Sequence, residues 1–185
     1  MDLFATARLR VRRLESADAE AMLGIYGDKE TMRFVGDGRP FDIDGCRFWI
    51  EATDRNFARR GYGMMAAADR ETGELIGCVG ICHPGLQEEP ELKYAIRRDR
   101  WGKGLATELA LGALHYAQTK LGLRRLIARV YAANTRSQAV LRKAGFDYVS
   151  TRRHLDGSLI QVWAVEASRP PIHPAAENEL NTVTA

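Results

Sequence analysis

One short stretch constrains this chain more than any other, residues 97–108 with the sequence RRDRWGKGLATE. It follows an apolar, strand-like run at 92–96 and precedes apolar residues at helical spacing over 105–119. The pattern predicts a strand, a basic glycine turn and the first turn of a helix. Such a turn presents unpaired backbone N–H groups, the positive end of a helix dipole and cationic side chains at one point. We therefore expect it to bind a phosphate or diphosphate.

Size and composition indicate a single globular domain. The chain has 185 residues, of which 45% are hydrophobic, enough for a substantial core. A net charge of +3 suits an anionic ligand but is too weak to argue for nucleic acid. No apolar stretch approaches the roughly 18 residues of a membrane span. Because the first residues lack the basic-then-apolar order of a secretory signal, we expect a cytoplasmic protein without membrane partners.

The cysteines favour free thiols. Their number is odd, three, and no signal peptide precedes them, which argues against a disulfide framework. Cys78, Cys82 and His83 suggest a metal site, but no second ligand pair follows and both cysteines lie in a strand-like run. We expect buried thiols and no metal.

Hydrophobic periodicity and turn residues predict an alternating order of strands and helices. Strands are expected at 9–12, 62–68, 75–82, 92–96, 125–131, 146–151 and 159–165, with those from 62 to 96 forming an antiparallel meander. Helices are expected after a Ser16 cap, at 43–58, at 105–119, and from a cap at Asn134 or Thr135 to Gly145. The segment 27–40 is expected to be irregular. The domain is placed at 6–167, and the proline-rich tail 168–185 is expected to be poorly ordered.

A second motif lies some thirty residues after the basic turn: NTRS at 134–137, followed by AVLRKAGF at 139–146. Together with RLRVR at 8–12, ELKYAI at 91–96 and WGKGLATE at 101–108, it resembles the GNAT superfamily of N-acetyltransferases. The resemblance is strongest to the RimJ/RimL-like ribosomal-protein branch. It implies an α+β fold of three layers, with a mixed, mostly antiparallel sheet of about seven strands and about four flanking helices.

The resemblance also implies a cofactor, acetyl-coenzyme A. The turn would offer its backbone to the diphosphate through Gly102, Lys103, Gly104, Leu105, Ala106 and Thr107. Lys103 and either Arg98 or Arg100 would add charge. Backbone groups of Ala95 and Ile96 would contact the pantetheine arm, with one amide polarising the thioester carbonyl, and Asn134 would lie beside that arm. The interpretation without a ligand is a glycine surface turn and a helix-capping asparagine.

Two residues are candidates for catalysis. Glu91 begins the strand that lines the cleft in the family, so it is the candidate base for the attacking amine. Its alternative is an exposed carboxylate beside Glu88 and Glu89. Ser137 matches the serine that RimL-like enzymes place near the sulfur, where it would protonate the leaving thiolate; its alternative is an ordinary serine in the first turn of a helix. Tyr94 and Tyr131 are weaker candidates and are expected to pack in the sheet.

The acceptor stays open at this point. The resemblance favours the α-amine of a protein N-terminus, but the same architecture serves small amines such as aminoglycosides, polyamines and amino acids. An acidic cluster of Glu88, Glu89 and Glu91 would attract any cationic acceptor and does not discriminate. A non-catalytic acyl-coenzyme A sensor is the alternative from a different class. A homodimer is compatible with the resemblance, although no sequence feature requires one.

Overall fold

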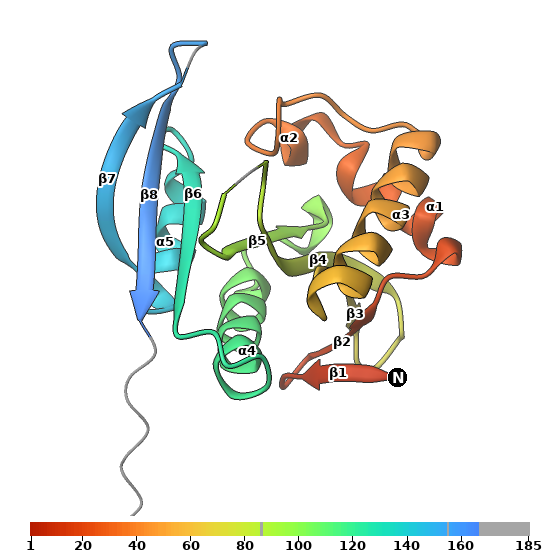
Figure 1. Cartoon of the computed structure of the whole chain (residues 1–185). Coiled ribbons are helices and arrows are strands. Elements are labelled where there is room, and N and C mark those ends of the chain that lie inside the picture. The colour runs from red at the N-terminus through yellow and green to blue at the C-terminus, as the bar shows by residue number, and fades with distance from the viewer. Residues whose placement is uncertain (86, 155, 167–185) are drawn as a thin grey trace, which may run out of the picture.

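The computed structural model describes residues 1–85, 87–154 and 156–166 (Figure 1). The strands are β1 Asp2–Ala5, β2 Leu9–Arg13, β3 Met64–Asp69, β4 Leu75–Cys82, β5 Glu91–Ile96, β6 Arg125–Tyr131, β7 Asp147–Arg153 and β8 Leu159–Glu166. The α-helices are α1 Ala19–Tyr26, α2 Lys29–Met32, α3 Ile43–Arg60, α4 Leu105–Thr119 and α5 Thr135–Lys143. Two 3₁₀ turns, Ser16–Asp18 and Arg98–Arg100, precede α1 and the basic turn.

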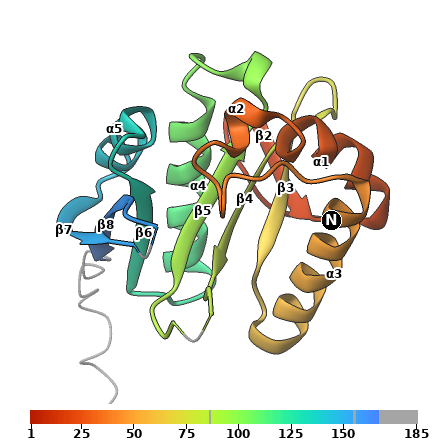
Figure 2. The same ribbon diagram turned by 90° about the horizontal axis from the view of Figure 1, so that it is seen from above.

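The described strands form one sheet in the order β1-β2-β3-β4-β5-β6-β8-β7. The predicted antiparallel meander of β3, β4 and β5 is confirmed. The pair β5 and β6 is parallel, and its ladder consists of one bridge, Glu91↔Ile127. Beyond that bridge the two strands diverge (Figure 2). From there on, the edge of β5 that faces β6 pairs with no strand among the described residues.

Helices cover both faces of the sheet, which gives the three layers expected. Helices α1 to α3 lie on one face and α4 on the other (Figure 2). Because successive strand side chains point to opposite faces, β5 contributes to both layers. Leu92 and Ile96 belong to the core cluster beneath α4, whereas Ala95 belongs to the cluster beneath α1 and α3. Residues 91, 93 and 95 of β5 therefore share the α1/α3 face, and residues 92, 94 and 96 share the α4 face.

Several local expectations were wrong. Strand β1 was not predicted, because four residues are too few to show an alternating pattern. It lies before residue 6, where the domain was expected to begin, pairs with β2 and brings the described sheet to eight strands. The short helix α2 lies in the segment expected to be irregular, with Asp28 accepting from the Thr31 amide as its cap. Ser16 does not cap a helix, since Glu15 and Asp18 form a capping box there. Phe48, an apolar residue of the helix predicted at 43–58, is 65% exposed.

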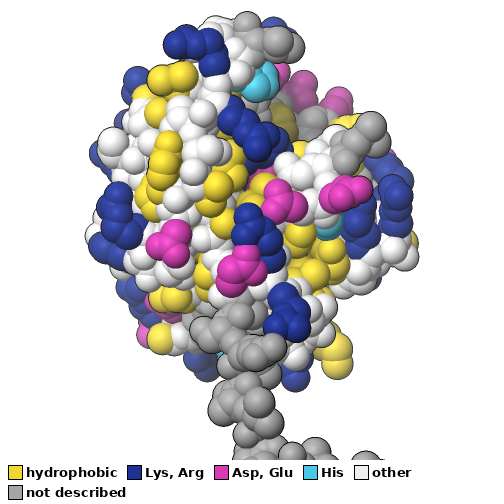
Figure 3. Space-filling view, turned by 60° about the vertical axis from the view of Figure 1, so that its left-hand side comes forward, with side chains coloured by type: hydrophobic (Ala, Val, Ile, Leu, Met, Phe, Trp, Pro, Cys, Tyr) yellow, Lys and Arg dark blue, Asp and Glu magenta, His cyan; other side chains and the backbone are white. Residues whose placement is uncertain are grey.

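The face seen in Figure 3 has no patch of a single charge sign; cationic, acidic and apolar side chains are interspersed on it. Within the described residues, none of the helices is both long and apolar enough to cross a membrane. The tail 168–185, predicted to be poorly ordered, lies outside the described residues.

Candidate functional site

The basic turn joins the end of β5 to the first residue of α4. Gly102 and Gly104 have φ of 75° and 76°, left-handed values that favour glycine. A Cβ on Gly102 would meet no atom within 4 Å, and one on Gly104 would meet only Arg8 Nη2 at 3.7 Å. The first amides of a helix have no partner within the helix. The backbone of this turn is therefore open to close approach, and the residues present fit a diphosphate.

Trp101 ties this turn to its surroundings. Its indole Nε1 donates to the Ile96 carbonyl at 2.6 Å, and its ring packs against the core cluster beneath α4. The guanidinium of Arg136, from the first turn of α5, lies 5.5 Å from the centre of the Trp101 ring. Trp101 thus links the turn to β5 and brings a cation of α5 toward it.

Arg8 is a residue of this region that the sequence did not single out. Its Nη1 donates to the Lys103 carbonyl at 2.9 Å, and its Nε pairs with Glu108 at 2.7 Å. Glu108 also accepts from the Arg8 amide at 2.7 Å and from the Thr6 hydroxyl at 2.6 Å. Burial by itself raises the pKa of Glu108, but these hydrogen bonds outweigh it and hold that pKa below its ordinary value. No local signal reveals this contact, because about a hundred residues separate its members.

The cations expected to assist the turn are differently placed. Arg100 pairs with Glu74 at 2.7 Å, with its side chain only 26% exposed, and Arg98 lies 3.6 Å from Asp28. These arginines are thereby engaged with neighbouring carboxylates. Lys103 is exposed and has no carboxylate within 4 Å among the described residues. Lys103, between the two glycines, is therefore without a carboxylate partner in this part of the described chain, whereas Arg8 lies beside Gly104 and is paired with Glu108.

The β5 backbone offers an amide at the open edge. Arg97 donates to the Ile76 carbonyl across β4, and N–H directions alternate along a strand. The N–H of Ile96 therefore points away from β4, toward the side on which β6 diverges. The carbonyl of Ala95 points toward β4 instead. It would lie only 2.7 Å from a Cβ if Gly77 of β4 were replaced by a residue with a side chain. Of the two predicted backbone contacts, Ile96 is the one that the open edge presents.

Ser137 lies against β5 on the α4 face. Its Oγ is 2.8 Å from the phenol oxygen of Tyr94. Burial raises the pKa of Tyr94 to about 12, although the Ser137 hydrogen bond lowers it slightly. Asn134 caps α5, its Oδ1 accepting from the Ser137 amide at 3.1 Å, as one of the predicted roles requires. The structure thus brings together Ser137, Asn134 and Tyr94, which was a weaker candidate expected to pack in the sheet.

Glu91 lies on the opposite face and is not an exposed carboxylate. Its side chain is 2% exposed, and Oε2 accepts from both Nε and Nη2 of Arg129 at 2.8 Å. Its Oε1 lies 3.2 Å from Lys93 Nζ. The acidic cluster expected from the sequence is therefore reduced to Glu88 and Glu89, which are exposed, and Glu89 is paired with Arg125. Glu91 and Ser137 lie on opposite faces of β5.

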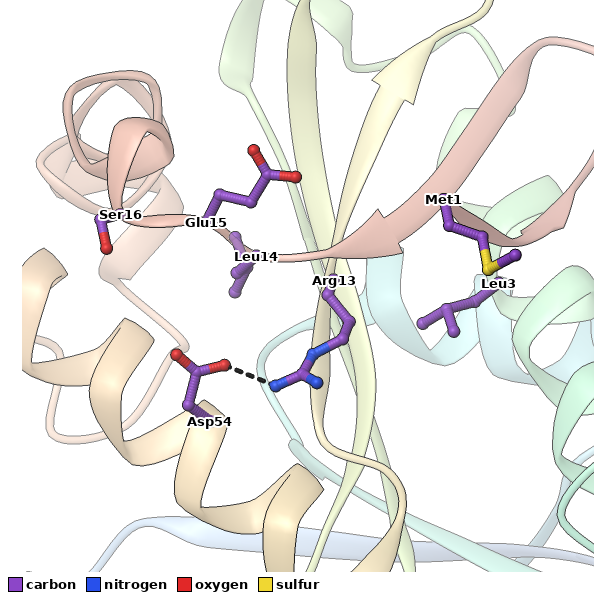
Figure 4. Close-up of a pocket in the computed structure, with 7 residues that line it drawn as sticks. All are labelled: Met1, Leu3, Arg13, Leu14, Glu15, Ser16 and Asp54. Carbon is purple, nitrogen blue, oxygen red and sulfur yellow. Dashed lines mark hydrogen bonds and ion pairs between the residues drawn. The ribbon is translucent and has the colours of Figure 1, made fainter.

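The thiols and a hollow of the surface lie elsewhere. Cys46 and Cys78 are buried and Cys82 is half-buried, all three free. Within residues 1–85, 87–154 and 156–166, no group of histidine, cysteine and carboxylate side chains is placed to hold a metal. A hollow on the β1, β2 and α3 side is lined by Met1, Leu3, Arg13, Leu14, Glu15, Ser16 and Asp54 (Figure 4). It contains none of the predicted site residues.

Residues 8–147 match the model of a family described as an acetyltransferase (GNAT) domain. The chain belongs to the GNAT family of acetyltransferases. It is 27% identical over 167 residues to "Uncharacterized N-acetyltransferase p20" of Bacillus licheniformis, covering 88% of this chain and 94% of that one. A crystal structure of an acetyltransferase from Agrobacterium tumefaciens str. C58 is 28% identical, with a TM-score of 0.72 over 88% of this chain and 93% of that one.

The ribosomal branch is also among the structural neighbours of this GNAT chain. RimL, the ribosomal L7/L12 α-N-protein acetyltransferase in complex with coenzyme A, superposes with a TM-score of 0.77, covering 90% of this chain and 98% of that one. At 14% identity this similarity shows the fold alone. The predicted family, the mixed α+β fold and the acyltransferase class are confirmed, and the donor of this GNAT enzyme is acetyl-coenzyme A.

Proposed function

We propose that this GNAT acetyltransferase acetylates the α-amine of a protein N-terminus by direct attack in a ternary complex. The observation that carries the proposal is the open edge of β5, which presents the Ile96 amide, while Ser137 contacts Tyr94 of the same strand and Glu91 lies at its bridged end. An amide donor, a hydroxyl and a carboxylate along one strand are the groups that acyl transfer to an amine requires.

Acetyl-coenzyme A supplies the thioester that the amine attacks. The chain binds it through the backbone of residues 102–107, with Lys103 and Arg8 placed to neutralise the diphosphate. Asn134, at the first turn of α5, is placed to contact the pantetheine arm, and the Ile96 amide to donate to the thioester oxygen.

The positions of the side chains suggest which groups accept and donate protons in the reaction. The attacking amine must be neutral, so a base takes its proton as the new C–N bond forms. Glu91 is the proposed base, although its pairing with Arg129 and Lys93 means that it acts through a water or after local rearrangement. As the C–S bond breaks, Ser137, held by Tyr94, gives a proton to the leaving sulfur and regains one from solvent.

The acceptor class rests on the RimJ/RimL-like resemblance together with the similarity of the architecture to RimL, which is named for acetylating a protein α-amine. A small amine is the competing acceptor. A protein N-terminus and a small amine differ in size, so activity toward a panel of both kinds of acceptor distinguishes between them.

The test is release of free thiol from acetyl-coenzyme A in the presence of N-terminal peptides, amino acids, polyamines and aminoglycosides. We expect release that depends on peptide and products acetylated at the α-amine by mass spectrometry. Acetylation restricted to small amines overturns the proposed acceptor. Calorimetric binding of coenzyme A without release for any amine indicates a sensor and overturns the catalytic proposal.

A further inference from the structure

The ion-pair group of Glu91, Lys93 and Arg129 has an uneven distribution of exposure. The carboxylate is buried, whereas the side chains of Lys93 and Arg129 are 41% and 38% exposed. One carboxylate is shared between two cations, so the group carries one net positive charge. The charge that this group exposes to a ligand is therefore positive, although its buried member, Glu91, is acidic.

The position of the group relates it to the open edge. The parallel bridge pairs Glu91 with Ile127, so Lys93 and Arg129 lie at the same level on β5 and β6, two residues further along. Because strand residues advance about 3.3 Å each, this level is about 7 Å beyond the bridge, where the strands begin to diverge. Both side chains lie on the α1/α3 face, opposite Tyr94 and Ser137.

Aromatic side chains border the same face. Tyr131, two residues after Arg129 on β6, donates from its hydroxyl to the Gly36 carbonyl at 3.1 Å. Its ring lies 5.9 Å from that of Phe34. The segment between α2 and α3 is thereby held over the end of β6, beside the two cations. An acceptor approaching from this face would meet apolar rings and two positive charges.

We propose that Lys93 and Arg129 bind a carboxylate carried by the acceptor on the same residue as the reacting amine. This inference rests on the proposed function, since it names a chemical property of the acceptor for that site. Buried Glu91 positions both cations and leaves their remaining donors for the ligand; an arginine keeps further N–H groups after pairing through two. The carboxylate is the side chain of an acidic first residue of a peptide; a free amino acid, whose α-carboxylate would meet the same cations, is the outcome that would also overturn the proposed peptide acceptor.

The experiment compares acceptors of matched shape that do or do not carry a carboxylate. One pair is an amino acid and its α-amide, and the other is a peptide with N-terminal Asp or Glu and the same peptide with Asn or Gln. For the peptide pair, we expect the charged acceptor to have a kcat/KM about tenfold higher, and this preference to shrink with added salt. The pair that shows the preference identifies the source of the carboxylate.

The discriminating variant is Lys93→Gln. It leaves Arg129 paired with Glu91, whereas removing Arg129 would strip the buried carboxylate of its main partner. We expect the ratio of kcat/KM between charged and amide acceptors to fall to within twofold of one. Arg59→Gln is the control, because it removes an equal charge from the exposed last turn of α3 and should keep the tenfold ratio. Equal use of both acceptors by the wild type, or a preference that survives Lys93→Gln, overturns the inference.

A binding measurement separates this inference from the proposed function. The N-acetylated acid and its amide are titrated into the coenzyme A-loaded protein and followed by calorimetry. Tighter binding of the acid that depends on Lys93 supports the inference even where no amine is acetylated. Acetylation with no charge preference in turnover or binding overturns the inference alone and leaves the acetyltransferase proposal standing.

Discussion

The phenol oxygen of Tyr94 lies 2.8 Å from Ser137 Oγ, and this contact joins β5 to the first turn of α5. Because burial raises the pKa of Tyr94 to about 12, the phenol keeps its proton over the range in which an enzyme is assayed. The serine hydroxyl therefore has a fixed neutral partner beside the open edge of β5. Its orientation depends on a strand residue more than forty positions away.

Tyr94→Phe should lower turnover. The substitution keeps the ring in the core but removes the partner of Ser137, so we expect kcat to fall about tenfold, roughly 1.4 kcal/mol in the barrier. The dissociation constant of coenzyme A should stay within twofold. Tyr116→Phe, a similar change at a buried tyrosine of α4, is the control. An unchanged kcat in Tyr94→Phe would mean that the contact is only structural.

Gly104→Asp should abolish binding of coenzyme A. The carboxylate would stand against the diphosphate, and we expect at least a hundredfold weaker binding by calorimetry. A side chain at φ 76° also strains the backbone by about 1–2 kcal/mol. Gly61→Asp controls for that strain, because Gly61 has the same φ at the end of α3 and open space around it. Equal affinities in the two variants would refute the assignment of the phosphate turn.

Glu91→Gln should lower kcat while coenzyme A affinity is retained. Loss of the partner of Arg129 and Lys93 should also lower the free energy of unfolding by about 1–3 kcal/mol. Glu88→Gln changes an exposed neighbour and serves as the control. A turnover unaltered at every pH would leave Glu91 as a buried ion-pair partner and nothing more.

Glu108→Gln should destabilise the protein at neutral pH and have little effect in acid. A carboxylate whose pKa is lowered by folding stabilises the fold above its ordinary value of about 4.3. That contribution is lost as the pH falls through the lowered value. We expect a difference of about 2 kcal/mol in urea denaturation at pH 7, shrinking toward zero near pH 3. Glu20→Gln on the exposed side of α1 should show no such pH dependence.

The thiols should resist modification while the protein is folded. Burial raises the pKa of Cys78 and of Cys82 to about 12, so the reactive thiolate is scarce at pH 8. We expect slow reaction with a disulfide reagent in buffer and rapid titration of three thiols in denaturant. Three equivalents reacting within seconds in buffer would contradict the buried positions.

Much of the fold was predictable because its signals are local. The helix 105–119 and the strands 75–82 and 125–131 were predicted with the bounds the structure has, since each carries a clear period and adjacent turn residues. Strand β1 and helix α2 were missed, because each has four residues, too few for a period to show. The capping role of Asn134 was predicted from residue type alone, and the structure confirms it.

The sequence by itself determined the family, the glycine turn and the order of most elements, because these depend on residue types at short, fixed spacings. Only the tertiary structure decided which side chains contact one another and which charged groups are exposed. Arg8 reaches Lys103, Tyr94 reaches Ser137, and Glu91 is buried between Arg129 and Lys93. Each of these contacts joins elements far apart in the chain or depends on burial. Neither long-range contact nor burial can be predicted from the neighbouring residues in the sequence. Glu91, expected as part of an acidic cluster, is on folding a buried carboxylate behind two partly exposed cations.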